Sequence, residues 1–172
     1  MTRPRVVVIG GGAGGLELAT RLGNKLGRKG KAHITLIDRN HTHIWKPLLH
    51  EVATGTLDVE IDQLSYRAHA ATHGFEFQLG SFYGLNRQQK TVTLAPVYAD
   101  DGEEVLAARE LAYDYLVLAI GSVSNHFNTP GVAEHCIFLD SPAQAQRFHR
   151  HLLDAYLKLN SPGHPKDKLN IA

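Results

Sequence analysis

The pattern of hydrophobic and polar residues begins with a short apolar strand. Residues 6–9 are Val-Val-Val-Ile, a continuous β-branched run that is typical of a parallel strand covered on both faces. Glycines dominate positions 10–15, and apolar residues then recur at spacings close to 3.6 as far as Leu26, which predicts a helix. A second apolar run, residues 33–37, ends at Asp38. These segments predict one βαβ unit with a right-handed crossover.

The middle of the chain has weaker and more varied patterns. Residues 41–58 show no clear period, whereas apolar positions at helical spacing predict a helix over residues 61–72 that Gly74 closes. The runs 75–79 and 91–94 both alternate apolar with polar residues, and polar turns follow them. This texture indicates an antiparallel meander.

The last third of the chain predicts a strand and then a long helix. Residues 115–120 form a continuous apolar run, interpreted as a buried strand that ends at Gly121. The residues Asp140-Ser141-Pro142 are a strong helix start, because a capping side chain precedes a proline at the first turn, and the helix should reach about Leu159. The whole order predicts an α/β domain: a Rossmann-like parallel sheet with an antiparallel β-meander insertion.

Composition narrows the class of protein. With 43% hydrophobic and 20% charged residues among 172, the chain can bury a core. Its 18 Lys and Arg residues against 17 Asp and Glu residues give a net charge of +1, so no nucleic-acid partner is expected. No apolar run approaches the roughly 18 residues of a membrane-spanning helix, and no secretory signal is recognisable. The chain is expected to be soluble.

Cysteine and histidine suggest no metal or disulfide chemistry. The single cysteine, Cys136, cannot form an internal disulfide and is expected to be a small buried residue. Eleven histidines are many for this length, but their spacing, for example at His41, His43 and His50, does not suit a zinc site. We therefore expect no metal site.

Three glycines carry the main chemical signal. Gly10, Gly12 and Gly15 form the pattern G-x-G-x-x-G directly after a predicted strand and at the start of a predicted helix. The first glycine allows a tight turn, the second lets a pyrophosphate approach the backbone, and the third lets helix and strand pack closely. This context predicts a dinucleotide-binding loop, whose phosphates meet the helix N-terminus.

An acidic residue completes this fingerprint. Asp38 ends the second predicted strand roughly 20 residues beyond the loop, where its carboxylate can accept hydrogen bonds from a ribose diol. A carboxylate there disfavours a 2′-phosphate, so NADP is the least expected dinucleotide. Arg39 could accommodate such a phosphate or lie against an adenine ring. The fingerprint alone leaves NAD and FAD as alternatives.

At this point the sequence resembles a known group of flavoproteins. Residues 6–19, together with Ile37-Asp38-Arg39, resemble the start of the flavoproteins with two dinucleotide-binding domains, in which the first fingerprint holds FAD. Residues 113–122 resemble the second flavin motif of that group, with Ile120 in place of the usual threonine, and residues 128–131 match the Pro-Gly that commonly follows.

Within that group, residues 41–55 (HTHIWKPLLHEVATG) most resemble the type II NADH dehydrogenases, which are non-proton-pumping NADH:quinone oxidoreductases of respiratory membranes. The resemblance implies bound FAD, with NADH and a quinone engaged through regions beyond residue 172. It implies an FAD-binding domain over 1–140, a connecting helix over 141–160 and, over 161–172, a linker with the first strand of a truncated NADH-binding domain. It also implies peripheral attachment of the full-length protein to the cytoplasmic face of the plasma membrane, and an inactive isolated fragment.

The fingerprint and the resemblance together imply a set of cofactor-binding residues: Gly10, Gly12, Ala13, Gly14, Gly15, Asp38, Arg39, Lys46, Pro47, Thr54, Phe82, Ala119, Gly121 and Ser122. Lys46 is also the one candidate for a catalytic role, because a positive charge near the pyrimidine edge of a flavin would stabilise its anionic reduced form. Its alternative role is that of a solvent-facing lysine.

Three other functions stay open. The first is another pyridine nucleotide-dependent flavin reductase of the same fold, although a dithiol in this domain is excluded because no cysteine precedes Cys136. The second is the first domain of an NAD-dependent dehydrogenase, against which the meander argues, since a plain NAD domain would continue with βαβ units. The third is a nucleotide-binding module without redox chemistry.

Overall fold

The computed structural model describes residues 2–58 and 61–161, which form two compact units. The first unit consists of Met1–His43 with Leu64–Gly121, and the second of Ile44–Gln63 with Ser122–Ala172. Each unit is considered by itself. The domain limits at residues 140 and 160 stay a prediction, and the predicted strand at 169–172 lies outside the described residues.

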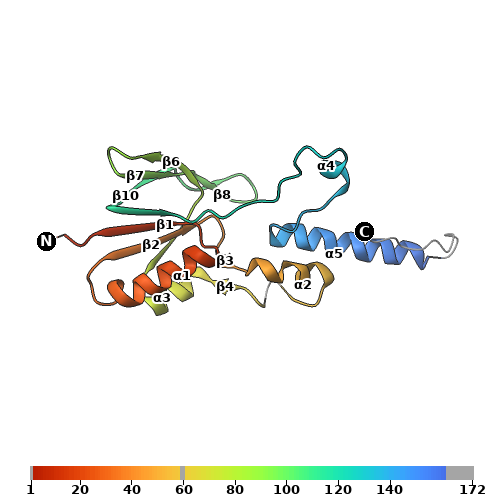
Figure 1. Cartoon of the computed structure of the whole chain (residues 1–172), viewed down its shortest axis with the longest axis horizontal. Coiled ribbons are helices and arrows are strands. Elements are labelled where there is room, and N and C mark those ends of the chain that lie inside the picture. Colours follow the sequence, from red (N-terminus) through yellow and green to blue (C-terminus); the bar gives the residue numbers. More distant parts are fainter. Residues whose placement is uncertain (1, 59–60, 162–172) are drawn as a thin grey trace. The chain divides into compact units, whose positions relative to one another are not determined.

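A parallel sheet forms the centre of the first unit. Its four strands lie in the order β11-β1-β2-β5 (Figure 1) and comprise β1 (Arg5–Ile9), β2 (His33–Asp38), β5 (Glu76–Leu79) and β11 (Tyr115–Leu118). Helix α1 (Ala13–Leu22) connects β1 to β2 and continues into a π-helical turn, Gly23–Gly27. The predicted βαβ unit and the α/β fold class are confirmed.

The two faces of this sheet are covered by different structures. Helices α1 and α3 (Tyr66–His73) cover one face, and an antiparallel sheet lies on the other (Figure 1). Because side chains alternate along a strand, Val6 and Val8 pack toward the helices, while Val7 and Ile9 pack toward the antiparallel sheet. Burial on both faces explains why β1 is apolar from Val6 to Ile9.

The antiparallel part confirms the predicted meander. Three of its strands pair in the order β10-β7-β6, namely β6 (Phe82–Asn86), β7 (Thr91–Leu94) and β10 (Arg109–Ala112). Two short pairs accompany them: β3 (Thr42–His43) with β4 (Leu64–Ser65), and β8 (Val97–Tyr98) with β9 (Glu104–Leu106).

Two predictions for the region from residue 61 to residue 79 are wrong. The helix begins at Tyr66 rather than at 61, because Ser65 caps it by accepting a hydrogen bond from the Ala68 N–H, and Ile61 is 78% exposed. The alternating run 75–79 does not belong to the meander. Helix α3 carries the chain back across the sheet, so that β5 joins β2 as a parallel edge strand.

Two predictions of burial are also wrong. Strand β11 is an edge strand of the described sheet, with β1 as its partner, so Leu118 and the following Ile120 are 51% and 70% exposed. Only Val117 and Ala119 of this segment pack partly against the core on the helix side. Cys136 lies just after the short helix α4 (Val132–His135) and is exposed.

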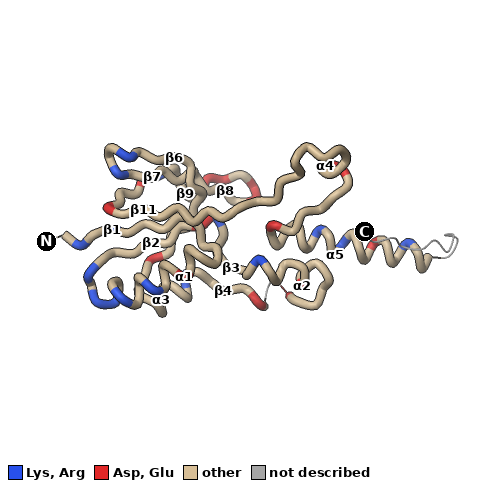
Figure 2. Tube along the Cα trace, in the orientation of Figure 1, with Lys and Arg blue, Asp and Glu red and all other residues tan. Residues whose placement is uncertain are grey.

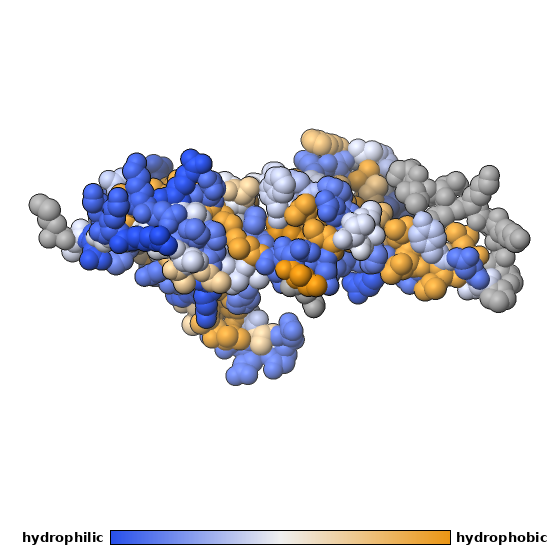
Figure 3. Space-filling model, turned by 90° about the horizontal axis from the view of Figure 1, so that it is seen from below, coloured by the Kyte–Doolittle hydropathy of each residue, from blue (hydrophilic) through white to orange (hydrophobic). Residues whose placement is uncertain are grey.

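The second unit is built around two helices. A 3-10 turn, Lys46–Leu48, leads into α2 (Leu49–Thr54), whose buried residues pack with Ala145 and Phe148 of α5 (Pro142–Leu159). The predicted start of α5 is confirmed, since the Ser141 hydroxyl accepts a hydrogen bond from the Gln144 N–H at 3.3 Å. Apolar side chains reach the surface on the C-terminal half of α5 (Figure 3), where Leu157 is 68% exposed. None of the helices in the described residues is long and apolar enough to cross a membrane.

An ion pair links the first strand to the residue before β11. The Arg5 backbone N–H donates to Asp114 Oδ2 at 2.7 Å, and the Arg5 guanidinium lies 3.3 Å from the same oxygen. These hydrogen bonds hold the pKa of Asp114 below its ordinary value of 3.8. A carboxyl group with a lowered pKa stabilises the fold above its ordinary pKa, and this contribution is lost as the pH falls through the lowered value.

We therefore predict that Asp114→Asn lowers the melting temperature at pH 7, where Asp114 is ionised. The difference from wild type should shrink as the pH falls below 3.8. Thermal unfolding followed by circular dichroism at several pH values measures it, with Glu110→Gln, an exposed residue of β10, as the matched control. A deficit that stays constant down to pH 2 would contradict the assignment.

Candidate dinucleotide-binding site

The turn from β1 to α1 meets the end of β11, and two of its glycines are required by this contact. Gly10 has φ +100°, and a Cβ on it would overlap the carbonyl oxygen of Ala119. A Cβ on Gly15 would overlap the carbonyl oxygen of Gly10 and lie 3.1 Å from the Ala119 Cβ. The first and third glycines of the fingerprint thus allow the close packing of strand, turn and helix that the sequence predicts.

The second glycine is not required by the fold. A Cβ on Gly12 would have no heavy atom of the described chain within 4 Å, and the backbone there has φ −61° and ψ 179°, which other residues adopt readily. The space beside Gly12 is therefore open. This is what a loop needs when another molecule must approach its backbone.

The N-terminus of α1 can bind an anion. Gly12 is the N-cap residue, and no described side chain accepts a hydrogen bond from the free N–H groups there. The first helical bond runs from the Leu16 N–H to the Gly12 carbonyl at 2.9 Å, so the N–H groups of Gly12, Ala13 and Gly14 have no acceptor within the helix. Together with the positive end of the helix dipole they suit a phosphate.

A cluster of lysine and arginine residues in the first unit lies away from the glycine loop. In the first unit many of them gather in the connection between α1 and β2, at Lys25, Arg28, Lys29 and Lys31 (Figure 2). That connection precedes β2, whereas the glycine loop follows β1. Because β1 and β2 are parallel, the connection lies at the amino ends of the strands and the loop at their carboxyl ends. Backbone N–H groups are thus the principal anion donors at the loop.

Asp38 lies beside the glycine loop, as the sequence predicts. Its Oδ2 accepts a hydrogen bond from the Gly11 N–H at 2.7 Å, and its Oδ1 accepts one from the Asn40 N–H at 2.8 Å. Each carboxylate oxygen keeps a further lone pair, which can accept from a ligand hydroxyl. Arg39 follows directly and is exposed.

A residue that sequence reasoning missed lies under the loop. Tyr66, the first residue of α3, is 2% exposed, and its hydroxyl donates to the Gly11 carbonyl at 2.7 Å. Its ring stacks on Phe77 with centroids 5.1 Å apart, and His43 Nδ1 lies 3.5 Å from its hydroxyl. Burial first, and then the negative charge of Asp38, raise the pKa of Tyr66 well above its ordinary value. Burial lowers the pKa of His43.

The other predicted residues of the first unit lie close to the loop. Ala119 donates its N–H to the Ile9 carbonyl at 2.7 Å, and Gly121 has φ +70°. Phe82 packs on the meander side of the sheet. Gly80 lies two residues before Phe82, and its N–H donates to the Asp38 carbonyl at 2.9 Å. The backbone before Phe82 therefore lies beside the end of β2.

The structure places four of the predicted residues in the second unit. Lys46 Nζ donates to the Ser122 carbonyl at 2.8 Å and lies 3.3 Å from Asp140 Oδ1. A hydrogen bond from the Ser124 N–H is the main cause that lowers the pKa of Asp140, and Lys46 adds to it. Pro47 belongs to the 3-10 turn, and Thr54 ends α2 with its hydroxyl 3.1 Å from the His50 carbonyl. Lys46 thus has partners within its own unit.

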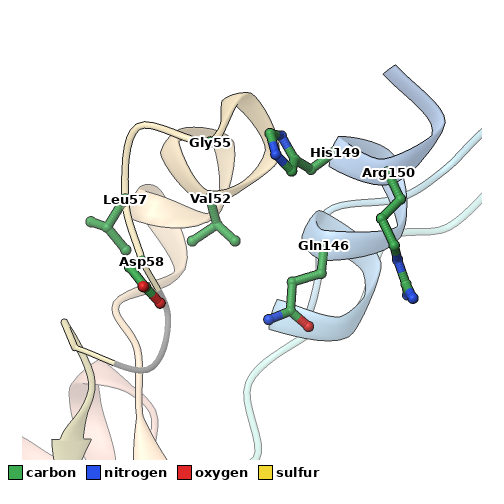
Figure 4. A pocket seen from close by; sticks show the side chains of 7 residues that line it. All are labelled: Val52, Gly55, Leu57, Asp58, Gln146, His149 and Arg150. Atoms are coloured by element: carbon green, nitrogen blue, oxygen red, sulfur yellow. The ribbon is translucent and has the colours of Figure 1, made fainter. Parts of the chain in front are cut away.

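A cavity of the second unit contains none of the predicted residues. It measures about 440 Å³ and lies between α2 with its following loop and α5, as Figure 4 shows. Val52 and Leu57 form its apolar side, Gln146 and His149 reach toward it from α5 (Figure 4), and Arg150 also lines it. The His149 ring occupies the place of a Cβ on Gly55. The glycine loop belongs to the first unit, and what it offers a ligand is its free N–H groups.

Across residues 2–58 and 61–161, no group of three or more His, Cys, Asp and Glu side chains is arranged to hold a metal ion.

Together, the parallel sheet, the glycine turn at the carboxyl end of β1 and the acidic residue at the end of β2 define a dinucleotide-binding α/β domain. Comparison with known families gives the more specific assignment. Residues 4–164 match the model of the pyridine nucleotide-disulphide oxidoreductases, and the chain belongs to this family.

Individual relatives agree with the family assignment. The chain is 61% identical over 155 residues to a type II NADH:quinone oxidoreductase of Haemophilus influenzae, which covers 90% of this chain and 35% of that protein. It is 32% identical over 134 residues to the external alternative NAD(P)H-ubiquinone oxidoreductase B1 of Arabidopsis thaliana mitochondria. That alignment covers 76% of this chain and 23% of the plant protein. The chain thus spans about a third or less of the length of these relatives.

Solved structures support the fold. The structure of NDH2 from Plasmodium falciparum in complex with NADH superposes with a TM-score of 0.74 at 23% identity, covering 95% of this chain and 31% of that one.

The crowding at Gly15 gives a testable prediction for folding. Gly15→Ala should lower the free energy of unfolding by about 1–3 kcal/mol, because the new Cβ overlaps the Gly10 carbonyl and forces the helix away from the strand. Gly14→Ala is the matched control, since a Cβ there has no heavy atom within 4 Å in the described chain. It should leave stability unchanged or raise it by up to about 1 kcal/mol. Urea unfolding of both variants tests this, and equal effects would refute the packing argument.

Proposed function

We propose that the complete protein carrying this chain is an FAD-dependent NADH:quinone oxidoreductase and that this chain binds its FAD. The observation that carries the proposal is the open backbone of Gly12, beside an Asp38 carboxylate that the loop itself holds in place. The 61% identity to a type II NADH:quinone oxidoreductase supports this choice among the flavin reductases.

The residues of the loop fit FAD. The N–H groups of Gly12, Ala13 and Gly14 would face the diphosphate, and Asp38 would accept hydrogen bonds from the adenosine ribose. Arg39 and the backbone near Phe82 are proposed to lie along the adenine, and Ala119, Gly121 and Ser122 toward the ribityl end. A negative carboxylate at the ribose repels a 2′-phosphate, which favours dinucleotides without one.

A bound flavin would supply the redox chemistry between NADH and a quinone. The residues of this chain bind and orient the cofactor. In the second unit, Lys46, Pro47 and Thr54 are proposed flavin contacts on the basis of the sequence resemblance. Lys46 would stabilise a reduced flavin through its positive charge. To do so, it would have to leave the Asp140 carboxylate or contact both groups at once.

The NADH and quinone sites, and peripheral attachment to the cytoplasmic face of the plasma membrane, are proposed to belong to parts of the protein outside residues 1–172. The NADH and quinone sites are supported by the substrates in the relatives' names together with the chain's share of their length, and the membrane attachment by the sequence resemblance. An NAD-dependent dehydrogenase domain is the alternative, and spectroscopy separates the two.

The proposal predicts the colour of the complete protein. Purified without added cofactor, it should be yellow, with the visible absorption of oxidised flavin. Anaerobic NADH should bleach this absorption, and a soluble quinone analogue should restore it. A colourless protein that binds NAD would favour a dehydrogenase, and a yellow protein that NADH does not bleach would contradict the assignment of the reductant.

A second prediction concerns Gly12. Gly12→Val should abolish FAD retention, because the side chain occupies the open space that the diphosphate needs, while the cofactor-free protein keeps its melting temperature. Gly84→Val is the matched control, since a Cβ on Gly84 of β6 makes only ordinary contact with Thr93 at 3.6 Å. Flavin content per chain is measured after purification. A Gly12→Val protein with full flavin content would show that the diphosphate lies elsewhere.

A further inference from the structure

The backbone on both sides of Gly11 is held by side-chain hydrogen bonds, one of them part-buried and the other buried. The N–H of Gly11 belongs to the peptide that joins it to Gly10, and Asp38 accepts from this group at 2.7 Å. The carbonyl of Gly11 belongs to the peptide that joins it to Gly12, and the Tyr66 hydroxyl donates to this group at 2.7 Å. Asp38 and Tyr66 therefore fix the two peptide planes that meet at Gly11.

The second of these contacts determines where the Gly12 N–H points. In a planar trans peptide, the N–H of one residue lies opposite the carbonyl of the residue before it. Since Tyr66 is 2% exposed, its hydrogen bond draws the Gly11 carbonyl toward the interior. The Gly12 N–H is thereby turned outward, toward the open space beside Gly12.

We infer that Tyr66 is a positioning residue of the dinucleotide site: by holding the Gly11 carbonyl, it orients the Gly12 N–H toward the diphosphate of the bound cofactor. Tyr66 itself does not touch the cofactor. The inference rests on the proposed function, because it assumes that a diphosphate binds at this loop.

Three features hold the Tyr66 hydroxyl in place against the Gly11 carbonyl. Its ring is fixed by the stack on Phe77 at an interplanar angle of 23°, and its N–H donates to the His41 carbonyl at 3.1 Å. A Cβ on Gly11 would overlap the Tyr66 ring. Tyr66 thus explains a glycine that the G-x-G-x-x-G pattern does not require.

Its hydroxyl also remains a donor. The charged and titratable groups near it are Asp38 and His43, and at 3.5 Å the imidazole of His43 is a far longer contact than the Gly11 carbonyl. The raised pKa keeps the hydroxyl protonated. In addition, the Asp38 carboxylate polarises the neighbouring peptide, and such chained hydrogen bonds reinforce one another.

The test uses the complete protein, freed of flavin, and Tyr66→Phe, which keeps the ring and removes the hydroxyl. The variant leaves a buried carbonyl unpaired and the loop peptide free to rotate, so the dissociation constant of FAD should rise about tenfold. Tyr98→Phe is the matched control: Tyr98 of β8 is 59% exposed and lies outside the segments that the resemblance assigns to the flavin. It should bind FAD as wild type does.

Two smaller ligands separate positioning from general destabilisation. ADP contains the diphosphate, whereas adenosine contains only the ribose and adenine. Tyr66→Phe should weaken ADP binding about as much as FAD binding and leave adenosine binding unchanged, whereas Asp38→Ala should weaken both. Phe77→Leu removes the ring that stacks on Tyr66 but keeps the Tyr66 hydroxyl. It should weaken ADP binding by a smaller factor and leave adenosine binding unchanged.

The outcomes are distinct. A wild-type protein that binds neither FAD nor ADP overturns the proposed function, and this inference with it. A wild-type protein that binds FAD, with Tyr66→Phe equal to Tyr98→Phe, overturns this inference alone. Equal losses of ADP and adenosine affinity in Tyr66→Phe would likewise overturn it, because they would show that the tyrosine only supports the fold.

Discussion

The first unit depends on the meeting of three backbone segments at one point: the turn after β1, the start of α1 and the end of β11. A side chain at Gly10 or Gly15 would overlap carbonyl oxygens there. Because the segments approach so closely, α1 begins directly at the carboxyl edge of the parallel sheet, and its free N–H groups face outward. The binding property of the loop is therefore a consequence of how the fold closes.

This view separates glycines that the fold requires from those that a ligand requires. Gly10, Gly11 and Gly15 are each explained by an atom of the protein, namely the carbonyl of Ala119, the ring of Tyr66 and the carbonyl of Gly10. Gly12 and Gly14 have open space where a Cβ would point. A glycine without a structural reason, in a loop rich in free N–H groups, is the observation that most directly indicates a function.

Much of this arrangement could be predicted from the sequence, and the exceptions have physical causes. Strand β1 was recognisable because both of its faces are buried, and Asp38 because its distance from the loop follows from one βαβ unit. The strands misjudged, β5 and β11, are the edge strands of the sheet, where exposure breaks the continuous apolar pattern or leaves apolar residues uncovered. Tyr66 contacts a residue 55 positions away, and no local pattern signals such a contact.

Lys46 shows why the loop, rather than a single charged residue, carries the chemical assignment. The sequence resemblance gives this lysine the role of a positive charge beside a flavin, yet in its own unit it contacts the Asp140 carboxylate at 3.3 Å. An opposite charge at that distance offsets much of the field that Lys46 could exert on a third group. The N–H groups of Gly12, Ala13 and Gly14 have no such competitor among the described residues, because no side chain caps α1. If the chain binds FAD as proposed, preorganised backbone dipoles would determine where the cofactor binds, and Lys46 would influence the flavin only to the extent that Asp140 releases it.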